Sequence, residues 1–186
     1  MTVFELESAL VEFCAQNTSE LRFRSNEQTH EEIPPQVYSG FIPRDEVGSV
    51  IPGEIAVFPA IIVSAQHGNI ESKSVGEIVT VNIIVGCFDD TLNQQGYRDC
   101  CNLLQRLKDR FGEIDFIRET FAIRYPISWQ LNKKIGNTAV NNSYPYFFGE
   151  MQINFELPTM DTQFDVTKFD GDIMLGRYNE FPIPSE

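Results

Sequence analysis

Apolar and polar residues alternate most clearly along residues 78–88. One set of alternate positions is almost entirely aliphatic: Val79, Val81, Ile83, Val85 and Cys87. A period of two predicts a β-strand with this set on its core face. The other set mixes polar or small residues with three large apolar ones, Ile78, Ile84 and Phe88. We therefore expect the second face to be covered as well, either by this chain or by another copy of it.

Two other stretches repeat apolar residues every three or four positions, which predicts amphipathic helices. The first helix, residues 3–16, has its buried stripe at Val3, Leu6, Leu10, Phe13 and Cys14. The second has its stripe at Tyr97, Cys100, Leu104, Leu107 and Phe111. Residues 89–93 supply turn and N-cap chemistry before the second helix, and Gly112 predicts its end through a left-handed cap.

Three further strands complete the predicted fold. Residues 56–66 form an antiparallel hairpin with the central strand, through a turn at residues 67–69. Residues 121–131 place Tyr125 and Trp129 on a core face, and the strand at residues 146–157 places Phe155 there. The order α-β-β-α-β-β predicts an α+β fold, with one antiparallel sheet packed by two helices.

Three segments lack such a pattern. Residues 25–54 form a long proline-rich connection, residues 132–145 form a projecting loop, and residues 158–186 form an extended C-terminal arm rich in acidic and aromatic residues. A long structureless connection is uncommon inside a compact domain, so we expect this one to be functional or to lie against a partner. The chain is therefore expected to hold one α+β domain, residues 1–157, followed by the arm.

Surplus apolar surface is the feature that most clearly indicates a partner. Two helices cover one face of a small sheet, and large exposed apolar patches usually mark an interface. We therefore expect an obligate assembly. The predicted interface residues are Ile78, Ile84 and Phe88 of the central strand, Val37, Tyr38 and Phe41 of the connection, Lys133 and Lys134 of the loop, and Phe164 and Phe169 of the arm. For the two lysines, a solvated loop tip is the alternative interpretation.

Charge narrows the classes of partner. The 186-residue chain has 14 basic and 27 acidic side chains, a net charge of −13. A surface of this sign repels phosphate, so neither a basic groove for nucleic acid nor a basic helix for membrane docking is expected. The sequence has no secretory signal and no apolar run of about 20 residues, so we expect a protein made and kept in a cytoplasm.

Candidate catalytic and metal-binding residues are few. His30 and His67 have no partners at ligand spacing, and the four cysteines are expected to be reduced core residues. Asp89 and Asp90 could bind a divalent cation or act as an acid and base pair, although starting the following helix is the simpler role. We expect no enzyme activity, cofactor or metal. A small metal-dependent enzyme or ligand-binding domain is the alternative from another class.

Five segments of the chain occur in an order that is typical of one protein family. They are residues 34–43 (PPQVYSGFIP), 58–63 (FPAIIV), 86–89 (GCFD), 95–99 (QGYRD) and 125–130 (YPISWQ). In pattern and order, over about residues 1–157, the series resembles the tail terminator family of long-tailed bacteriophages. The arm after Leu157 and the loop at residues 132–145 depart from the pattern of that family.

The resemblance implies a structural subunit of the virion, assembled in the host cytoplasm at the tail and neck. It implies a hexameric ring that closes on the last ring of the tail tube and joins it to the head. The implied partners are further copies of the chain, the tail tube protein and the head-tail connector or neck protein. DNA would pass through the lumen without specific binding, since an acidic lumen repels the phosphate groups of DNA. Another neck, tail-tube or tail-completion protein is the alternative within this class.

Overall fold

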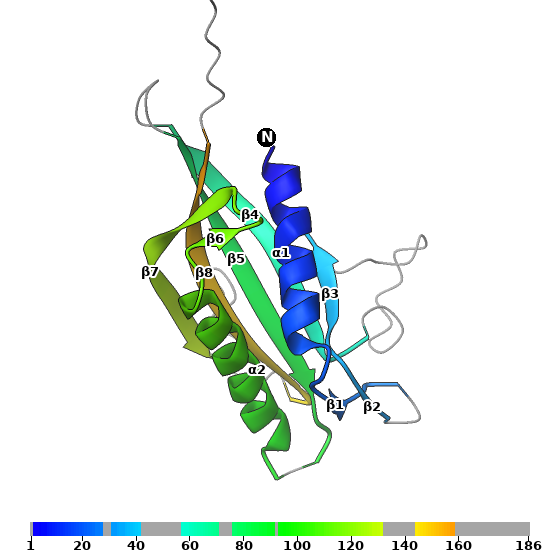
Figure 1. The fold of residues 1–186 in the computed structure, drawn as a ribbon. Helices are drawn as coiled ribbons and strands as arrows, with labels where there is room; N and C mark the ends of the chain where they lie inside the picture. Colours follow the sequence, from blue (N-terminus) through cyan, green and yellow to red (C-terminus); the bar gives the residue numbers. More distant parts are fainter. Residues whose placement is uncertain are drawn as a thin grey trace, which may run out of the picture.

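The computed structural model describes residues 2–27, 31–41, 57–70, 76–91, 93–131 and 144–158. These residues form an α+β fold, in which two helices pack on a six-stranded mixed sheet beside a small two-stranded sheet (Figure 1). The elements in chain order are α1 (Val3–Thr18), β1 (Phe23–Arg24), β2 (Glu32–Ile33), β3 (Gln36–Ser39), β4 (Ala60–Asn69), β5 (Glu77–Phe88), α2 (Gln95–Gly112), β6 (Phe116–Ile117), β7 (Phe121–Leu131) and β8 (Tyr146–Leu157). The predicted order is confirmed for the six long elements, and four short strands are added to it.

β5 lies in the middle of the large sheet, whose strand order is β3-β4-β5-β8-β7-β6. It pairs antiparallel with β4, as the predicted hairpin requires. It also pairs with β8 along its whole length, from Glu77 opposite Leu157 to Phe88 opposite Tyr146. β8 in turn pairs antiparallel with β7. The stretch with the clearest alternation in the sequence is therefore also the centre of the sheet.

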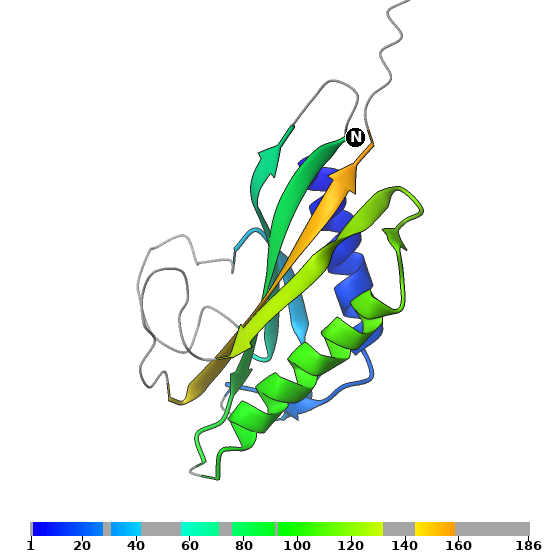
Figure 2. The ribbon, with the colours of Figure 1, turned by 90° about the vertical axis from the view of Figure 1, so that its left-hand side faces the viewer.

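Both helices cover the same face of the large sheet (Figure 2). The stripe residues Leu6 and Leu10 of α1 and Leu107 and Phe111 of α2 have no exposed surface. They pack against the aliphatic face of β5 and the matching face of β8, where Phe155 is also fully buried, as predicted. The hydrophobic core thus lies between the helix layer and one face of the sheet.

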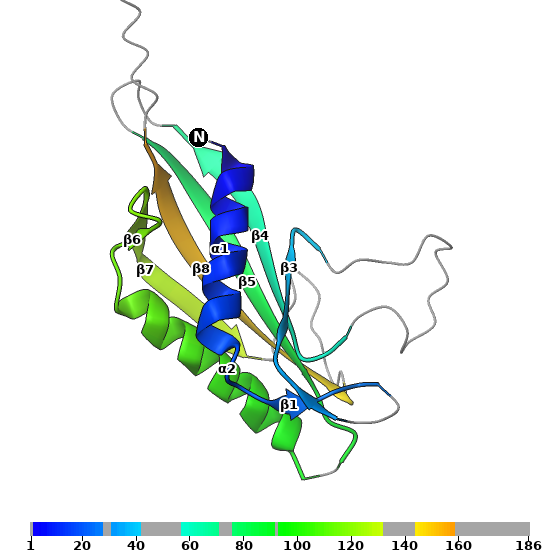
Figure 3. The same ribbon diagram turned by 45° about the vertical axis from the view of Figure 1, so that its right-hand side comes forward.

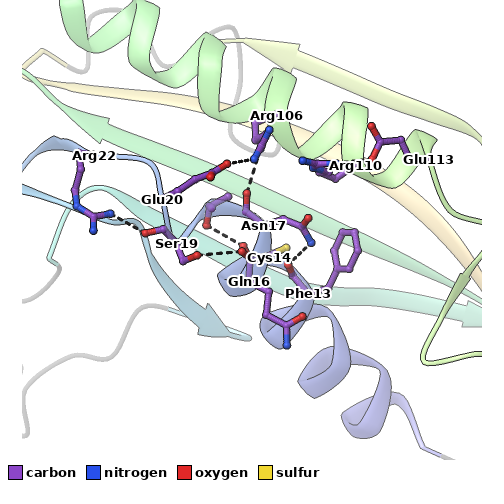
Figure 4. A network of polar contacts seen from close by, with 11 residues as sticks. Phe13, Cys14, Gln16, Asn17, Ser19, Glu20, Arg22, Arg106, Arg110 and Glu113 are labelled. Carbon is purple, nitrogen blue, oxygen red and sulfur yellow. Dashed lines mark hydrogen bonds and ion pairs between the residues drawn. The ribbon is translucent and has the colours of Figure 1, made fainter.

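Polar contacts hold both ends of α1. At its start, the Glu5 N–H donates to Thr2 Oγ1 and the Thr2 N–H donates to the Glu5 carboxylate, which is a capping box. At its end, Arg106 of α2 donates to the carbonyl of Asn17 over 3.2 Å and forms an ion pair with Glu20 (Figure 4). These contacts join the last turn of α1 to α2, so that the two helices form one layer.

The segment predicted as a structureless connection, residues 25–54, contains regular structure. Strands β2 and β3 lie within it, and β3 runs parallel to β4, with Val37 opposite Ile61 and Tyr38 opposite Ile62 (Figure 3). The prediction of an entirely antiparallel sheet is therefore wrong. β3 has only four residues, which is too short for its alternation to be detected in the sequence. Its parallel pairing with β4 could not be predicted from a hairpin turn either, because parallel strands are not joined by one.

Tyr125 and Trp129 are 61% and 52% exposed, so their prediction as core residues is wrong. β7 starts on the expected face, with Ile123 buried, but its register against β8 shifts between Arg124 and Ser128. Trp129 stands opposite Met151, on the helix side of the sheet, where Lys108 of α2 lies over its ring. The alternating pattern predicted the strand and the face of Trp129 correctly, but this part of β7 lies at the side of the sheet, where the helix layer covers it only in part.

Two boundaries also differ from the expectation. β4 continues through residues 67–69, which were expected to form a turn, because its pairing with β5 resumes past a bulge and extends to Asn69 opposite Ile78. α2 ends at Gly112, but the residue that follows, Glu113, has a φ of −86° and no left-handed cap closes the helix.

Candidate functional site

The second face of the large sheet has no described helix over it (Figure 2), and we call it the open face. The open face carries Ile62 and Ser64 of β4, Ile78, Thr80, Asn82, Ile84 and Phe88 of β5, Tyr146, Phe148, Glu150, Gln152, Asn154 and Glu156 of β8, and Arg124, Ser128 and Gln130 of β7. These positions alternate along each strand with the core residues described above. The open face is therefore a direct consequence of the period of two, and its character depends on what stands at those positions.

One end of the open face is an aromatic cluster. The centroid of the Phe58 ring lies 4.9 Å from that of Tyr146 and 5.9 Å from that of Phe148. Phe88 lies 5.4 Å from Tyr146, and Gly86 leaves room for the cluster, since a Cβ there would lie 2.5 Å from the Phe58 ring. Phe88 is only 8% exposed. At this end, the chain covers its own second face.

The remainder of the open face is a polar network. Glu150 accepts hydrogen bonds from Asn82 Nδ2 and Gln130 Nε2, each over 2.7 Å. Thr80 Oγ1 donates to Asn154 Oδ1 over 2.8 Å. The other polar atom of Asn82, its Oδ1, is buried without a hydrogen-bond partner in the described part of the chain. An unpaired buried acceptor costs about 1–3 kcal/mol, so this oxygen is the one polar atom of the described network that does not contribute to stability.

Apolar side chains lie among these polar groups. Ile62 and Ile84 stand opposite each other on β4 and β5 and are half-buried, and Ile78, also half-buried, stands opposite Glu156 of β8. Glu156 pairs with Arg124 across the neighbouring strand, over 2.6 Å to Nε. A surface that mixes apolar side chains with hydrogen-bonding groups in this way is typical of protein interfaces.

A shallow cavity of about 270 Å³ opens where the open face meets β7. It is lined by Ser128, Trp129, Gln130, Glu150 and Gln152. Lys108 of α2 approaches it from the helix side, with its Nζ 5.6 Å from the centroid of the Trp129 ring. The lining of the cavity therefore combines one carboxylate with one aromatic ring at the side of the sheet.

The alternative site, Asp89 and Asp90, lies where β5 ends. The Asp89 carboxylate accepts hydrogen bonds from Thr91 Oγ1 (2.5 Å), the Thr91 N–H (2.9 Å) and the Gly96 N–H (2.9 Å), and Asp90 pairs with Arg24 over 2.9 Å. Burial raises the pKa of Asp89, but the hydrogen bonds and the charge of Arg24 together hold that pKa below its ordinary value. Asp89 is thus an ionised acceptor within its own chain.

These contacts agree with the simpler role predicted for the aspartates. Gly96 lies in the first turn of α2, so Asp89 satisfies one of the free N–H groups at the start of that helix. The N-cap position itself is held by Gln94, whose side chain makes no capping hydrogen bond. A cavity of about 310 Å³ is lined by Asp89 and Asp99, among other residues. The pKa of Asp99 is raised above its ordinary value, mainly because the carboxyl group is partly buried.

Among the described residues, the histidine and cysteine side chains form neither a metal site nor a reactive thiol site. No group of three or more His, Cys, Asp or Glu side chains there could hold a metal ion. His67 Nε2 lies 3.3 Å from Thr80 Oγ1, while His30 lies outside the described residues. All four cysteines are free and three are buried, and burial raises the pKa of Cys14 to about 12, which keeps that thiol protonated. Neither described helix has the length and apolar character needed to span a bilayer.

The structure brings only some of the predicted interface residues together. Ile78 and Ile84 share the open face, and Tyr38 packs against its aromatic end. Val37 packs against the hydrophobic core, so it belongs to the fold, whereas Phe41 is 73% exposed just past β3.

Four predicted interface residues, Lys133, Lys134, Phe164 and Phe169, lie outside the described residues. The sequence analysis did not identify Glu150 and Asn154 as members of a polar network. In comparisons with known proteins, the sequence matches no protein-family model and no curated protein.

Proposed function

We propose that the chain is a structural subunit of a bacteriophage virion, a tail terminator or a closely related head-tail joining protein, that acts by forming a ring and catalyses no reaction. One observation carries the proposal: among the described residues, helices cover only one face of the large sheet. The open face holds half-buried isoleucines, Ile62, Ile78 and Ile84, beside a polar network. A sheet face of this composition is normally covered by a partner.

The location of the resembling segments supports the same class. Residues 58–63 and 86–89 meet in the aromatic cluster at the end of the open face. Residues 125–130 form the side of the sheet at β7. Three of the resembling segments therefore border the open face, while residues 95–99 begin α2 in the helix layer and residues 34–43 contain β3.

Charge supports the proposed partners. In the proposed ring, the contacts are with further copies of the chain, with the tail tube and with the head-tail connector. A net charge of −13 favours a channel through which DNA slides without being held. The proposed site of action is the tail and neck of the virion.

The test is the mass of the purified protein in solution, by light scattering after size exclusion over a concentration series, with negative-stain images of the main peak. We expect a mass near six chains and ring-shaped particles. Ile84→Asp should lower this mass without changing the circular dichroism spectrum, because it puts a charge on the open face. Asn102→Asp, at an exposed position on α2, is the matched control and should keep the wild-type mass. A stable monomer that neither self-associates nor binds tail tubes would contradict the proposal.

Truncation tests whether residues 159–186 serve assembly. Their removal is expected to leave the unfolding midpoint unchanged, since described residues between Leu6 and Leu157 form a continuous core between the helix layer and the sheet, and to reduce the oligomer mass. Denaturant unfolding and light scattering on the truncated chain measure the two effects separately. Loss of soluble protein on truncation would show instead that this segment belongs to the fold.

A further inference from the structure

The large sheet has two sides whose backbone is unpaired in the described part of the chain. On one side, β3 pairs with β4 only from Ala60 to Val63, and the Ala65 N–H is taken by Glu7 of α1 over 2.7 Å, so the outer backbone of residues 66–69 is left open. We call residues 66–69 the β4 edge. Open backbone at the side of a sheet is a template for pairing with another strand.

The opposite side is open in the same way (Figure 1). β6 pairs only with Phe121 and Ala122, and the Ile123 N–H donates to the Asp115 carbonyl over 2.9 Å. Beyond the register shift, residues 128–131 pair with β8 on their inner side, while their outer backbone has no partner among the described residues. We call residues 128–131 the β7 edge, which matches the β4 edge in length.

The directions of the two edges also match. β4, β5, β8 and β7 are antiparallel in succession, so β7 runs opposite to β4. When two copies stand side by side in the same orientation, the β7 edge of one meets the β4 edge of the next as an antiparallel pair. The antiparallel order of neighbouring strands then continues from one copy to the next.

Exposed apolar side chains flank both edges. Trp129 lies in the β7 edge and is 52% exposed, and Tyr125 lies just before that edge and is 61% exposed. Phe41 and Ile70, which flank the open part of β4, are 73% and 65% exposed. These four residues are half of the eight large hydrophobic side chains that are exposed in the described structure. Aromatic residues of this kind are the usual anchors of protein interfaces.

Charge distinguishes a head-to-tail contact from a two-fold one. Lys108 stands over Trp129 at the β7 edge. Carboxylates stand at the β4 edge, since Glu7 holds the Ala65 N–H and the Glu77 carboxylate lies against Gly68. Pairing β7 with β7 would bring two lysines together, and pairing β4 with β4 would bring carboxylates together. The β7-to-β4 contact instead brings Lys108 to the side that holds Glu7 and Glu77. The nearby carboxylate of Glu150 accepts hydrogen bonds from Asn82 and Gln130 of its own chain.

We infer that neighbouring copies join head to tail, with the β7 edge of one copy adding to the β4 edge of the next to extend the sheet. Such a contact uses two different surfaces, so it closes into a ring when the rotation between copies allows. The open faces of successive copies then form one continuous wall on the same side of the ring. This inference rests on the proposed ring assembly and names the surfaces that build it.

Cysteine crosslinking tests the contact directly. The double variant Gln66→Cys with Ser128→Cys places one thiol at each edge, at exposed positions. With a short bismaleimide, we expect a ladder of covalent oligomers that ends at six chains. Mixing the two single variants should give dimers that contain one chain of each. The wild type, which retains its own four cysteines, sets the background. Gln16→Cys with Asn102→Cys, at exposed positions on α1 and α2, is the matched control and should give no ladder.

Light scattering on the same samples separates the two levels of the proposal. An oligomer of wild-type mass without a ladder overturns the edge contact and leaves the proposed function standing. A wild type that is monomeric at every concentration and does not bind tail tubes overturns both. Loss of the oligomer in the edge variant, with the α2 control still assembled, supports the edge contact.

The fluorescence of Trp129, the single tryptophan of the chain, tests the burial of the β7 edge independently of crosslinking. Because Trp129 is half exposed at the β7 edge, its emission maximum should move to shorter wavelength as the wild type assembles. An unchanged spectrum across the assembly range would count against burial of this edge.

Discussion

The two faces of β5 differ in burial, although their residues alternate along one strand. Ile83 has no exposed surface because it lies under the helix layer, while its neighbour Ile84, on the open face, is half-buried. Across the sheet, Ile83 stands opposite Met151, also fully buried, whereas Ile84 stands opposite Glu150. The same side chain in the same strand therefore has two different roles. Burial depends on the second layer and not on the residue alone.

The faces also differ in how they use polar groups. In the described structure, the helix-covered face is a continuous apolar core, whereas the open face holds the Glu150 and Asn154 networks and one unpaired Asn82 oxygen. The covered face thus stabilises the fold, whereas the open face leaves apolar and polar side chains partly exposed.

The largest expected difference between the faces is measured by the pair Ile83→Ala and Ile84→Ala. Ile83→Ala should lower the free energy of unfolding by about 2–5 kcal/mol, because it leaves a cavity in a packed core. Ile84→Ala should cost about 1 kcal/mol, since its side chain is already partly in water. Urea unfolding of both variants, with unchanged m-values, gives the comparison. Equal losses would show that the open face is packed as tightly as the core.

A smaller effect is expected at the end of β5, where Asp89 joins the strand to α2. Asp89→Asn should cost about 0.5–2 kcal/mol, the range of a lost helix cap, because an ionised acceptor of three hydrogen bonds becomes neutral. Asp90→Asn, in an exposed position, should cost about 0–1 kcal/mol and is the matched control. A larger loss at Asp90 than at Asp89 would overturn this interpretation of the pair.

The pKa of Asp89 also predicts a pH dependence. Because this pKa is lower in the folded chain than in the unfolded one, its contribution to stability is present above the unfolded pKa of about 4. The contribution is lost as the pH falls from there through the lower folded pKa. Unfolding curves between neutral and acidic pH should therefore converge for wild type and Asp89→Asn at the acidic end. A constant difference at all pH values would contradict the assignment.

The smallest expected effect lies at the β7 edge. Lys108→Met keeps most of the side chain but removes the cation over Trp129, and it should change the free energy of unfolding by only about 0.5 kcal/mol. Under the edge contact proposed above, the same change should weaken assembly more than it weakens the fold. Unfolding and light scattering on one sample test this difference. A stability loss as large as that of Ile83→Ala would place Trp129 in the core after all.

Prediction from the sequence succeeded where one element carries its own pattern. The bounds of β7 and β8 were predicted at residues 121–131 and 146–157, and the hairpin of β4 with β5 was also predicted. Prediction failed where strand pairing or burial depends on neighbouring elements. β3 was missed because its four residues pair parallel with a strand reached through a long connection, and Trp129 was placed in a core that does not extend over it.

For the candidate site, the sequence alone determined that β5 has a mixed second face, because alternation assigns every residue of a strand to one of two sides. Only the tertiary structure decided how that face divides. Phe88 is covered by aromatic residues of β8 and by Phe58, whereas Ile78 and Ile84 are left among polar groups. The physical reason is that periodicity is local, while burial and the pairing of polar atoms depend on elements brought together from distant parts of the chain.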